Sequence, residues 1–236
     1  MPVRPTAIYL PLTALLLLAL LSAPAWAVDY RIEMVVFANN DEQAFHSEKW
    51  SQEAQPLSTD GALGLFDGHT RTGFRRLSTG TLDEARRLLE TSNRFTVLKH
   101  VAWQQPGLSA ADAVRIKLHG GRDYSADYPE RMQPRLEVGA AGNIVEIPGP
   151  DRLEELDGTV QVVLGRYLHV HTDLVLRKPT VVERIDRETG RPTRTQVLLD
   201  IPMQERRRMR SRELHYIDHP MLGVLVQITP VELPAQ

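Results

Sequence analysis

Runs of β-branched and apolar residues recur along this chain, and they limit its fold more than any other feature of the sequence. The longest run is 157–177 (DGTVQVVLGRYLHVHTDLVLR), which predicts one extended strand or a strand bent at Gly165. Several strands with no repeated strand–helix alternation predict a mainly antiparallel sheet structure. Shorter runs predict further strands at 30–37, 94–104, 113–118, 195–202 and 223–231.

One segment has the pattern of an amphipathic helix. Residues 81–84 (TLDE) supply a candidate N-cap and an acidic first turn. The apolar positions Ala85, Leu88 and Leu89 continue the pattern to an expected end near 92–93. We therefore predict the α+β class, mainly antiparallel with one clear helix, in a single domain that spans 28–236.

The remaining segments show little periodicity. We expect loop-rich connectors at 122–150 and 178–194, with a small hairpin at 134–147 about the sequence AAGN. The stretch 42–76 is predicted to be mostly loop, and 215–220 (HYIDHP) to be turn-like.

The first 27 residues have the pattern of a cleaved Sec signal peptide. One cation, Arg4, precedes an apolar stretch at 7–21, and the sequence AWA at 25–27 offers a small-x-small cleavage site. The apolar stretch is short for a membrane span, which takes about 20 residues. We therefore expect a periplasmic mature chain that starts near Val28 and is not stably inserted in a membrane.

Composition excludes several classes of protein. The sequence contains no cysteine, so disulfides, Cys-bound zinc and a lipidated N-terminal cysteine are impossible. The formal net charge is −2, and removal of 1–27 takes away Arg4 and no acid, which leaves −3. Bulk charge therefore argues against nucleic-acid binding, and the basic character of the chain is local.

That basic character gathers in 204–213 (QERRRMRSRE), where five arginines fall within seven residues. Guanidinium groups are planar forks that bind carboxylate or phosphate through two hydrogen bonds. A ladder of them along a strand would form an anion-recognition face. The alternative is that they solvate the strand or pair with Glu205 and Glu213. Strand alternation would place four of them on one face, about 6.6–6.8 Å apart: Arg206, Arg208, Arg210 and Arg212.

Two histidines, His169 and His171, share one face of the predicted strand 157–177 with Tyr167. A zinc site needs about four ligands, and no tight metal spacing is present. The simpler interpretation is two ordinary histidines on a half-exposed strand, and we expect no metal and no cofactor. The residues that could complete a ligand set are Asp173, His215, Asp218 and His219.

No catalytic motif stands out. Ser109, Ser125 and Ser211 lack the Gly-x-Ser-x-Gly elbow of a serine nucleophile. Carboxylate pairs for glycan cleavage are available, but a chain with 25% charged residues always offers such pairs. We therefore expect no catalytic residue. The glutamates concerned are Glu33, Glu137, Glu146, Glu154, Glu155 and Glu213.

Aromatic side chains could assist in binding sugars by stacking on a ring face. Trp103 and Tyr216 are the foremost candidates, followed by Trp50 and Tyr167. Each of them could equally be a core or interface residue.

Several segments together resemble the CsiV family of exported peptidoglycan-binding proteins of gamma-proteobacteria. The stretch RRMRSRELHYIDHPMLGVLVQI at 207–228 resembles the closing signature of that family. Five more segments fall in the expected order, so the resemblance covers nearly the whole mature chain. They are YRIEMVVF (30–37), EKW (48–50), LKHVAWQQPG (98–107), VRIKLHGG (114–121) and ELDGTVQVVLGRYLHVHTDLVLR (155–177).

The resemblance implies a periplasmic, non-enzymatic protein that binds peptidoglycan and supports cell-wall synthesis. It also implies action with an outer-membrane lipoprotein activator of a bifunctional penicillin-binding protein. No catalytic or binding residues carry over, so the arginine ladder stays an inference from chemistry. Two alternatives remain open at this point. One is a wall hydrolase or His-based metal enzyme, and the other is a scaffold that binds only a protein partner.

Overall fold

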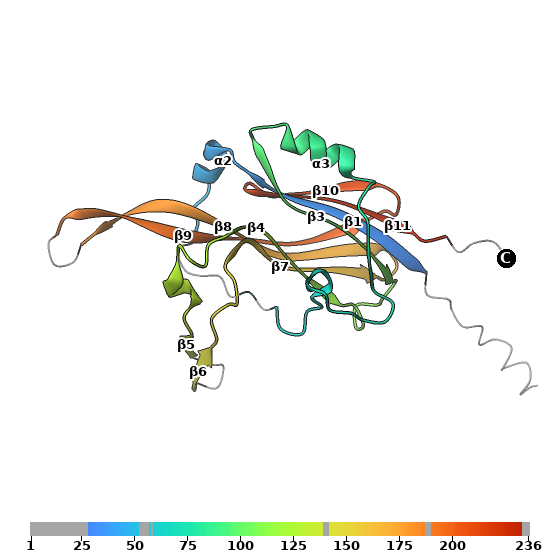
Figure 1. Cartoon of the computed structure of the whole chain (residues 1–236), viewed down its shortest axis with the longest axis horizontal. Coiled ribbons are helices and arrows are strands. Elements are labelled where there is room, and N and C mark those ends of the chain that lie inside the picture. The colour runs from blue at the N-terminus through green and yellow to red at the C-terminus, as the bar shows by residue number, and fades with distance from the viewer. Residues whose placement is uncertain (1–27, 52–56, 58, 139–141, 187–189, 233–236) are drawn as a thin grey trace, which may run out of the picture.

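The computed structural model describes residues 28–51, 57, 59–138, 142–186 and 190–232. The predicted signal peptide lies outside the described residues. Most of the described chain forms antiparallel strands, with few helices (Figure 1). The elements, in chain order, are β1 Asp29–Asn39, α2 Glu42–His46, η1 Leu65–Asp67, β2 Arg75–Leu77, α3 Asp83–Glu90, β3 Phe95–Pro106, β4 Arg115–Asp123, η2 Pro129–Met132, β5 Arg135–Val138, β6 Ile144–Ile147, β7 Glu154–Leu164, β8 Leu168–Ile185, β9 Pro192–Met209, β10 Leu214–Asp218 and β11 Leu222–Pro230.

Two sheets and a separate hairpin make up the fold. The first sheet has the strand order β10-β11-β1-β3-β2, and the second has the order β4-β7-β8-β9. Strands β5 and β6 pair only with each other among the described residues. The predicted α+β class, mainly antiparallel, is confirmed.

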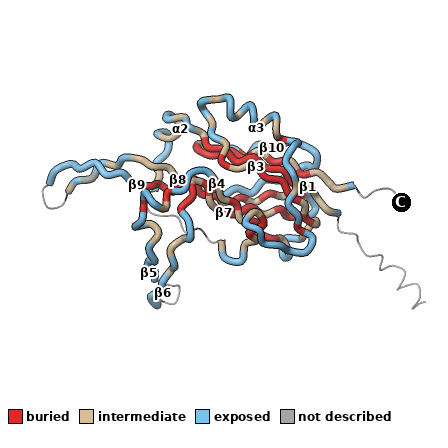
Figure 2. The backbone as a smooth tube through the Cα atoms, viewed as in Figure 1, coloured by how far each residue is buried: buried red, intermediate tan, exposed pale blue. Residues whose placement is uncertain are grey.

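The core lies between the two sheets, where Figure 2 shows the buried positions gathered. Met34 and Val36 of β1 face this core from the first sheet, and Val170 and Leu174 of β8 face it from the second. Because side chains alternate along a strand, the intervening residues of both sheets point away from the core. The second sheet therefore has an outer face that is free to carry polar groups.

Helix α3 covers part of the outer face of the first sheet (Figure 1). Its preceding residue Leu82 is buried and packs with Val35 and Phe37. The predicted N-cap at Thr81 is wrong, because the helix begins at Asp83 and no side chain of the N-cap residue bonds its first turn. The predicted apolar position Leu88 is also 66% exposed.

Strand predictions in the body of the fold are largely confirmed. The run 157–177 is not one extended or bent strand, because the chain reverses after Leu164 and β7 and β8 pair with each other as an antiparallel hairpin. The strand predicted at 113–118 starts at Arg115 and continues past Gly120 to Asp123 through a register shift. The turn-like segment predicted at 215–220 is wrong for its first four residues, which belong to β10 and pair with β11.

The polar connector predicted at 178–194 is wrong. Strands β8 and β9 stay paired from Leu168 opposite Met209 out to Ile185 opposite Pro192. They form a long two-stranded arm that projects from the body (Figure 1). Backbone pairing along the arm satisfies the polar groups of residues that have no core contact.

The connector predicted at 122–150 contains regular elements among its described residues. Its predicted hairpin is confirmed as β5 and β6, although residues 139–141 of the expected loop lie outside the described residues. The segment that connects β4 to β7 is called the excursion here. A second small core joins its described residues to the second sheet, where Tyr124, Tyr128 and Leu153 pack with Leu198 of β9. Leu198 lies on the outer face of the second sheet, so the excursion covers one end of that face.

Gly223 allows Phe37 to lie flat across β11. The two residues are directly opposite in the antiparallel pair, and a Cβ atom at position 223 would lie 2.3 Å from the Phe37 ring. We expect Gly223→Ala to lower the free energy of unfolding by about 1–3 kcal/mol through overpacking. Urea denaturation measures this change. Gly80→Ala is the matched control, because a Cβ there has nothing within 4 Å and should be nearly neutral.

Candidate functional site

Two of the predicted arginines lie on the outer face of the second sheet. Arg206 is opposite His171 and Arg208 is opposite His169 in the β8–β9 register. Both arginines are exposed, whereas Met209, the next residue along β9, is buried on the opposite face of the strand. The predicted alternation is therefore confirmed for this pair.

The arginines of this pair make no ion pair with another described residue. Among the described residues, neither Arg206 nor Arg208 has a carboxylate within ion-pair distance. The guanidinium of Arg208 lies 4.6 Å from the ring centre of Tyr167, a cation–π contact that restrains its position. We call Tyr167, His169, His171, Arg206 and Arg208 the basic strip.

The histidines of the basic strip do not assemble a metal site. His169 Nδ1 lies 3.1 Å from the carbonyl oxygen of Tyr167. Burial, and then the charges of Arg206 and His169, lower the pKa of His171, so its imidazole stays neutral at neutral pH. Within the described residues, no metal-like cluster includes either histidine. His215 of β10, considered as a further ligand, instead accepts a hydrogen bond at Nε2 from the backbone N–H of Arg210 at 3.1 Å.

The ladder prediction is wrong for the other two arginines. Strand β9 ends at Met209, so Arg210 and Arg212 lie in the turn that leads to β10. Arg212 has a φ of 67° there, a left-handed conformation that breaks strand alternation. Both arginines pair with acids, Arg210 with Glu213 at 3.6 Å and Arg212 with Glu232 at 2.9 Å. They are exposed, but they do not extend the basic strip.

The two aromatic residues first proposed for stacking do not join the strip. Trp103 is fully buried between the sheets, and its indole N–H donates to Gln105 at 2.8 Å, so the prediction that it binds a ligand is wrong. Tyr216 is 46% exposed, but it lies on the outer face of the first sheet. Its ring stacks on Phe37 and its hydroxyl donates to Asp218. Tyr167 is the aromatic residue that lies beside the arginines.

A pocket of about 830 Å³ opens farther along the same outer face, and we call it the charged pocket. Lys117 and His119 of β4 line it together with Asp157 of β7, Arg177 of β8 and Asp200 of β9. Its rim is formed by lining residues from 59–69, by Arg131 and Arg135, and by 147–153. Sequence reasoning missed this pocket, because its residues come from segments far apart in the chain.

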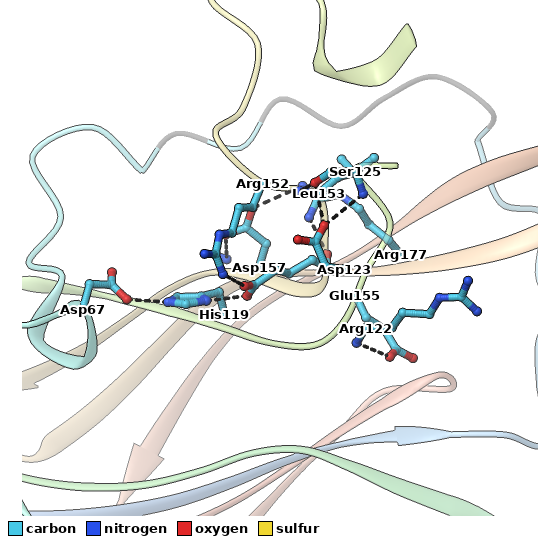
Figure 3. Close-up of polar contacts among 12 residues, drawn as sticks. Asp67, His119, Arg122, Asp123, Ser125, Arg152, Leu153, Glu155, Asp157 and Arg177 are labelled. Carbon is cyan, nitrogen blue, oxygen red and sulfur yellow. Dashed lines mark hydrogen bonds and ion pairs between the residues drawn. The ribbon is translucent and has the colours of Figure 1, made fainter. Parts of the chain in front are cut away.

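His119 contacts one carboxylate on each side of its ring and so links the 3-10 turn at the rim of the pocket to the sheet. One ring nitrogen contacts the carboxylate of Asp67 and the other contacts Glu154, as Figure 3 shows for Asp67. Burial raises the pKa of Asp67, but the hydrogen bond and charge of His119 outweigh it and lower the pKa. The 3-10 turn that carries Asp67 is thereby fixed against β4.

Arg177 is the buried cation of the pocket floor. It donates to the carbonyl oxygen of Glu154 at 2.7 Å and to Asp157 at 3.2 Å. Arg131, which also lines the pocket, donates a hydrogen bond to the carboxylate of Asp200 at 2.7 Å. A buried charge needs partners of this kind, because desolvation without them costs several kcal/mol.

A separate cluster of Glu33, Asp83 and His100 has metal-like spacing. The Glu33 carboxylate is buried, however, and accepts hydrogen bonds from His100 and from Arg31. It also accepts from the backbone N–H groups of 80, 81 and 82 at 2.8–3.0 Å. This carboxylate thus holds the turn at 80–82 that leads into α3, and it has no lone pairs left for a metal.

Comparison with known families identifies the chain. The family described as "Peptidoglycan-binding protein, CsiV" matches residues 9–231. The chain belongs to the CsiV family. The CsiV assignment confirms the resemblance read from the sequence and supports peptidoglycan binding. No curated protein and no solved structure matches the chain. Among the described residues, no helix has the length and apolar character needed to cross a membrane.

Glu33 should make the stability of the protein sensitive to acid. Burial raises its pKa, but its backbone, Arg31 and His100 hydrogen bonds outweigh burial and lower the pKa from 4.5 to about 2. Because the folded-state pKa is the lower one, the stabilisation is present above about pH 4.5 and is lost as pH falls towards 2. Between pH 6 and pH 2.5, Glu33 should account for about 2–3 kcal/mol of lost stability.

Urea denaturation of Glu33→Gln at the two pH values measures this contribution. The variant should be less stable than wild type at pH 6 and should lose less stability on acidification. Glu84→Gln, at an exposed position of α3, is the control and should follow wild type. An unchanged pH dependence in Glu33→Gln would contradict the assignment.

Proposed function

We propose that this chain is a periplasmic, non-enzymatic protein that binds peptidoglycan through the outer face of the β4-β7-β8-β9 sheet. The observation that carries this proposal is the basic strip. Arg206 and Arg208 are exposed, lie on one face and have no carboxylate partner among the described residues. Stem peptides of the wall carry carboxylates at D-Glu, diaminopimelate and terminal D-Ala, which suit such guanidiniums.

The expected affinity of one site is modest. An exposed arginine–carboxylate pair contributes only about 0.2–1 kcal/mol. Tyr167 should strengthen the contact between Arg208 and a wall carboxylate, because a guanidinium already held against a ring loses less conformational entropy when it binds. A polymer presents many copies of the same anion, so repeated contacts retain the protein without any new interaction.

Co-sedimentation with purified, protein-free sacculi tests the proposal. We expect wild type to pellet and Arg206→Ala/Arg208→Ala to bind roughly 2- to 30-fold more weakly, the equivalent of losing two exposed pairs. Arg210→Ala/Arg212→Ala is the matched control. It removes the same number of arginines from the turn, where both are paired with acids, and should pellet like wild type.

Three outcomes contradict parts of the proposal. If both double variants pellet like wild type, the wall is bound by another surface. If wild type stays in the supernatant, direct wall binding is wrong and a protein-only scaffold becomes the better account. Release of soluble wall fragments during incubation, abolished by a chelator, would favour the metal-enzyme alternative.

We also propose that the protein acts with an outer-membrane lipoprotein activator of a penicillin-binding protein. The family resemblance supports this part. The projecting β5–β6 hairpin offers a surface for a protein partner, because three large aliphatic residues share one of its faces and are more than 70% exposed. They are Leu136, Val138 and Ile144.

A further inference from the structure

The charged pocket leaves groups of both signs without partners. Lys117 lines it with no ion pair within the described part of the chain. Asp60 and Asp151, on the rim, likewise make no side-chain ion pair there. The other charged groups of the floor neutralise one another through the contacts of His119, Arg131 and Arg177 described above. A ligand that completes the pocket therefore needs both a positive and a negative group.

A buried donor points to the same conclusion. The Arg177 side chain is only 7% exposed, and its Nε–H has no hydrogen-bond acceptor among the described residues. The nearest carboxylate oxygen, on Asp200, is 3.7 Å away and too far for a hydrogen bond. An unsatisfied buried donor costs about 1–3 kcal/mol, so a small shift of the Arg177 side chain toward an anionic group in the pocket would be stabilising.

The dimensions fit a small ligand. A volume of about 830 Å³ lies within the range of about 300–1,000 Å³ that small-molecule sites occupy. On β8, Arg177 of the charged pocket lies six positions after His171 of the basic strip, or about 20 Å along the strand. An extended peptide of about five residues spans up to about 18 Å. This reach falls short of the distance between them, so the strip and the pocket are separate subsites.

We propose that the charged pocket binds a zwitterionic amino-acid centre, an ammonium and a carboxylate on one carbon. In peptidoglycan this group is the free end of a diaminopimelate residue in an uncrosslinked stem peptide. Lys117 and Arg177 bind the carboxylate, and Asp60 and Asp151 bind the ammonium. This assignment rests on the proposed wall binding and adds what the wall presents to the second subsite.

Isothermal titration with three soluble dipeptides tests the assignment, each acetylated on the D-Glu nitrogen so that D-Glu does not itself present a zwitterionic centre. The first probe is γ-D-Glu–meso-diaminopimelate, which carries both charged groups. In the second, lysine replaces diaminopimelate and removes the carboxylate. In the third, 2-aminopimelate removes the ammonium. We expect the first probe to bind and the other two to bind at least tenfold more weakly.

Two variants place the probe in the pocket. Lys117→Ala and Asp151→Asn should each weaken binding of the diaminopimelate dipeptide at least threefold, and Asp151 is exposed, so its variant should fold normally. Arg206→Ala/Arg208→Ala should bind the dipeptide like wild type, because the strip lies outside the pocket.

Several results would overturn the assignment. No detectable binding of the diaminopimelate dipeptide at millimolar concentration would do so, as would unchanged binding by both pocket variants. Equal binding of the 2-aminopimelate probe would make the pocket a plain anion site. If sacculi still pellet wild type in these cases, the pocket assignment fails and the proposed wall binding stands.

Discussion

Burial of one side of β8 and β9 in the core determines where the charged side chains on their other side point. Val170 and Leu174 of β8 pack against the facing sheet together with Met203 and Met209 of β9. Since side chains alternate with a period of two, a slip of one residue would turn every guanidinium of the strip into the core. The hydrophobic contact between the sheets thus fixes the register on which the proposed wall-binding face depends.

That face divides into two regions of different chemistry. The basic strip is exposed, keeps an excess of positive charge and suits the many carboxylates of a polymer. The charged pocket is partly enclosed by Arg131, Arg135 and 147–153, and it contains charges of both signs. In the proposed account, the open strip would retain the protein on the wall. The enclosed pocket would select one chemical group, because enclosed polar groups are costly to leave unpaired.

Local pattern predicted most strands but not the long-range contacts. The strands of the body were predictable because their β-branched runs alternate, whereas the arm at 178–194 is polar and is held by pairing that only the partner strand reveals. Trp103 could have faced either way, and its strand position alone did not show that it is buried. The charged pocket was unpredictable from local pattern, because His119 meets Asp67 and Glu154 only after the chain has folded.

Protection of single cysteines by sacculi tests most directly which face contacts the wall. The chain has no cysteine, so one introduced thiol reports one position. Gln204→Cys lies on the proposed face between the strip and the pocket, and Leu214→Cys lies on the outer face of the other sheet. Both positions are exposed. Sacculi should slow maleimide labelling at position 204 and leave position 214 unchanged. Protection at 214 with none at 204 would contradict the account.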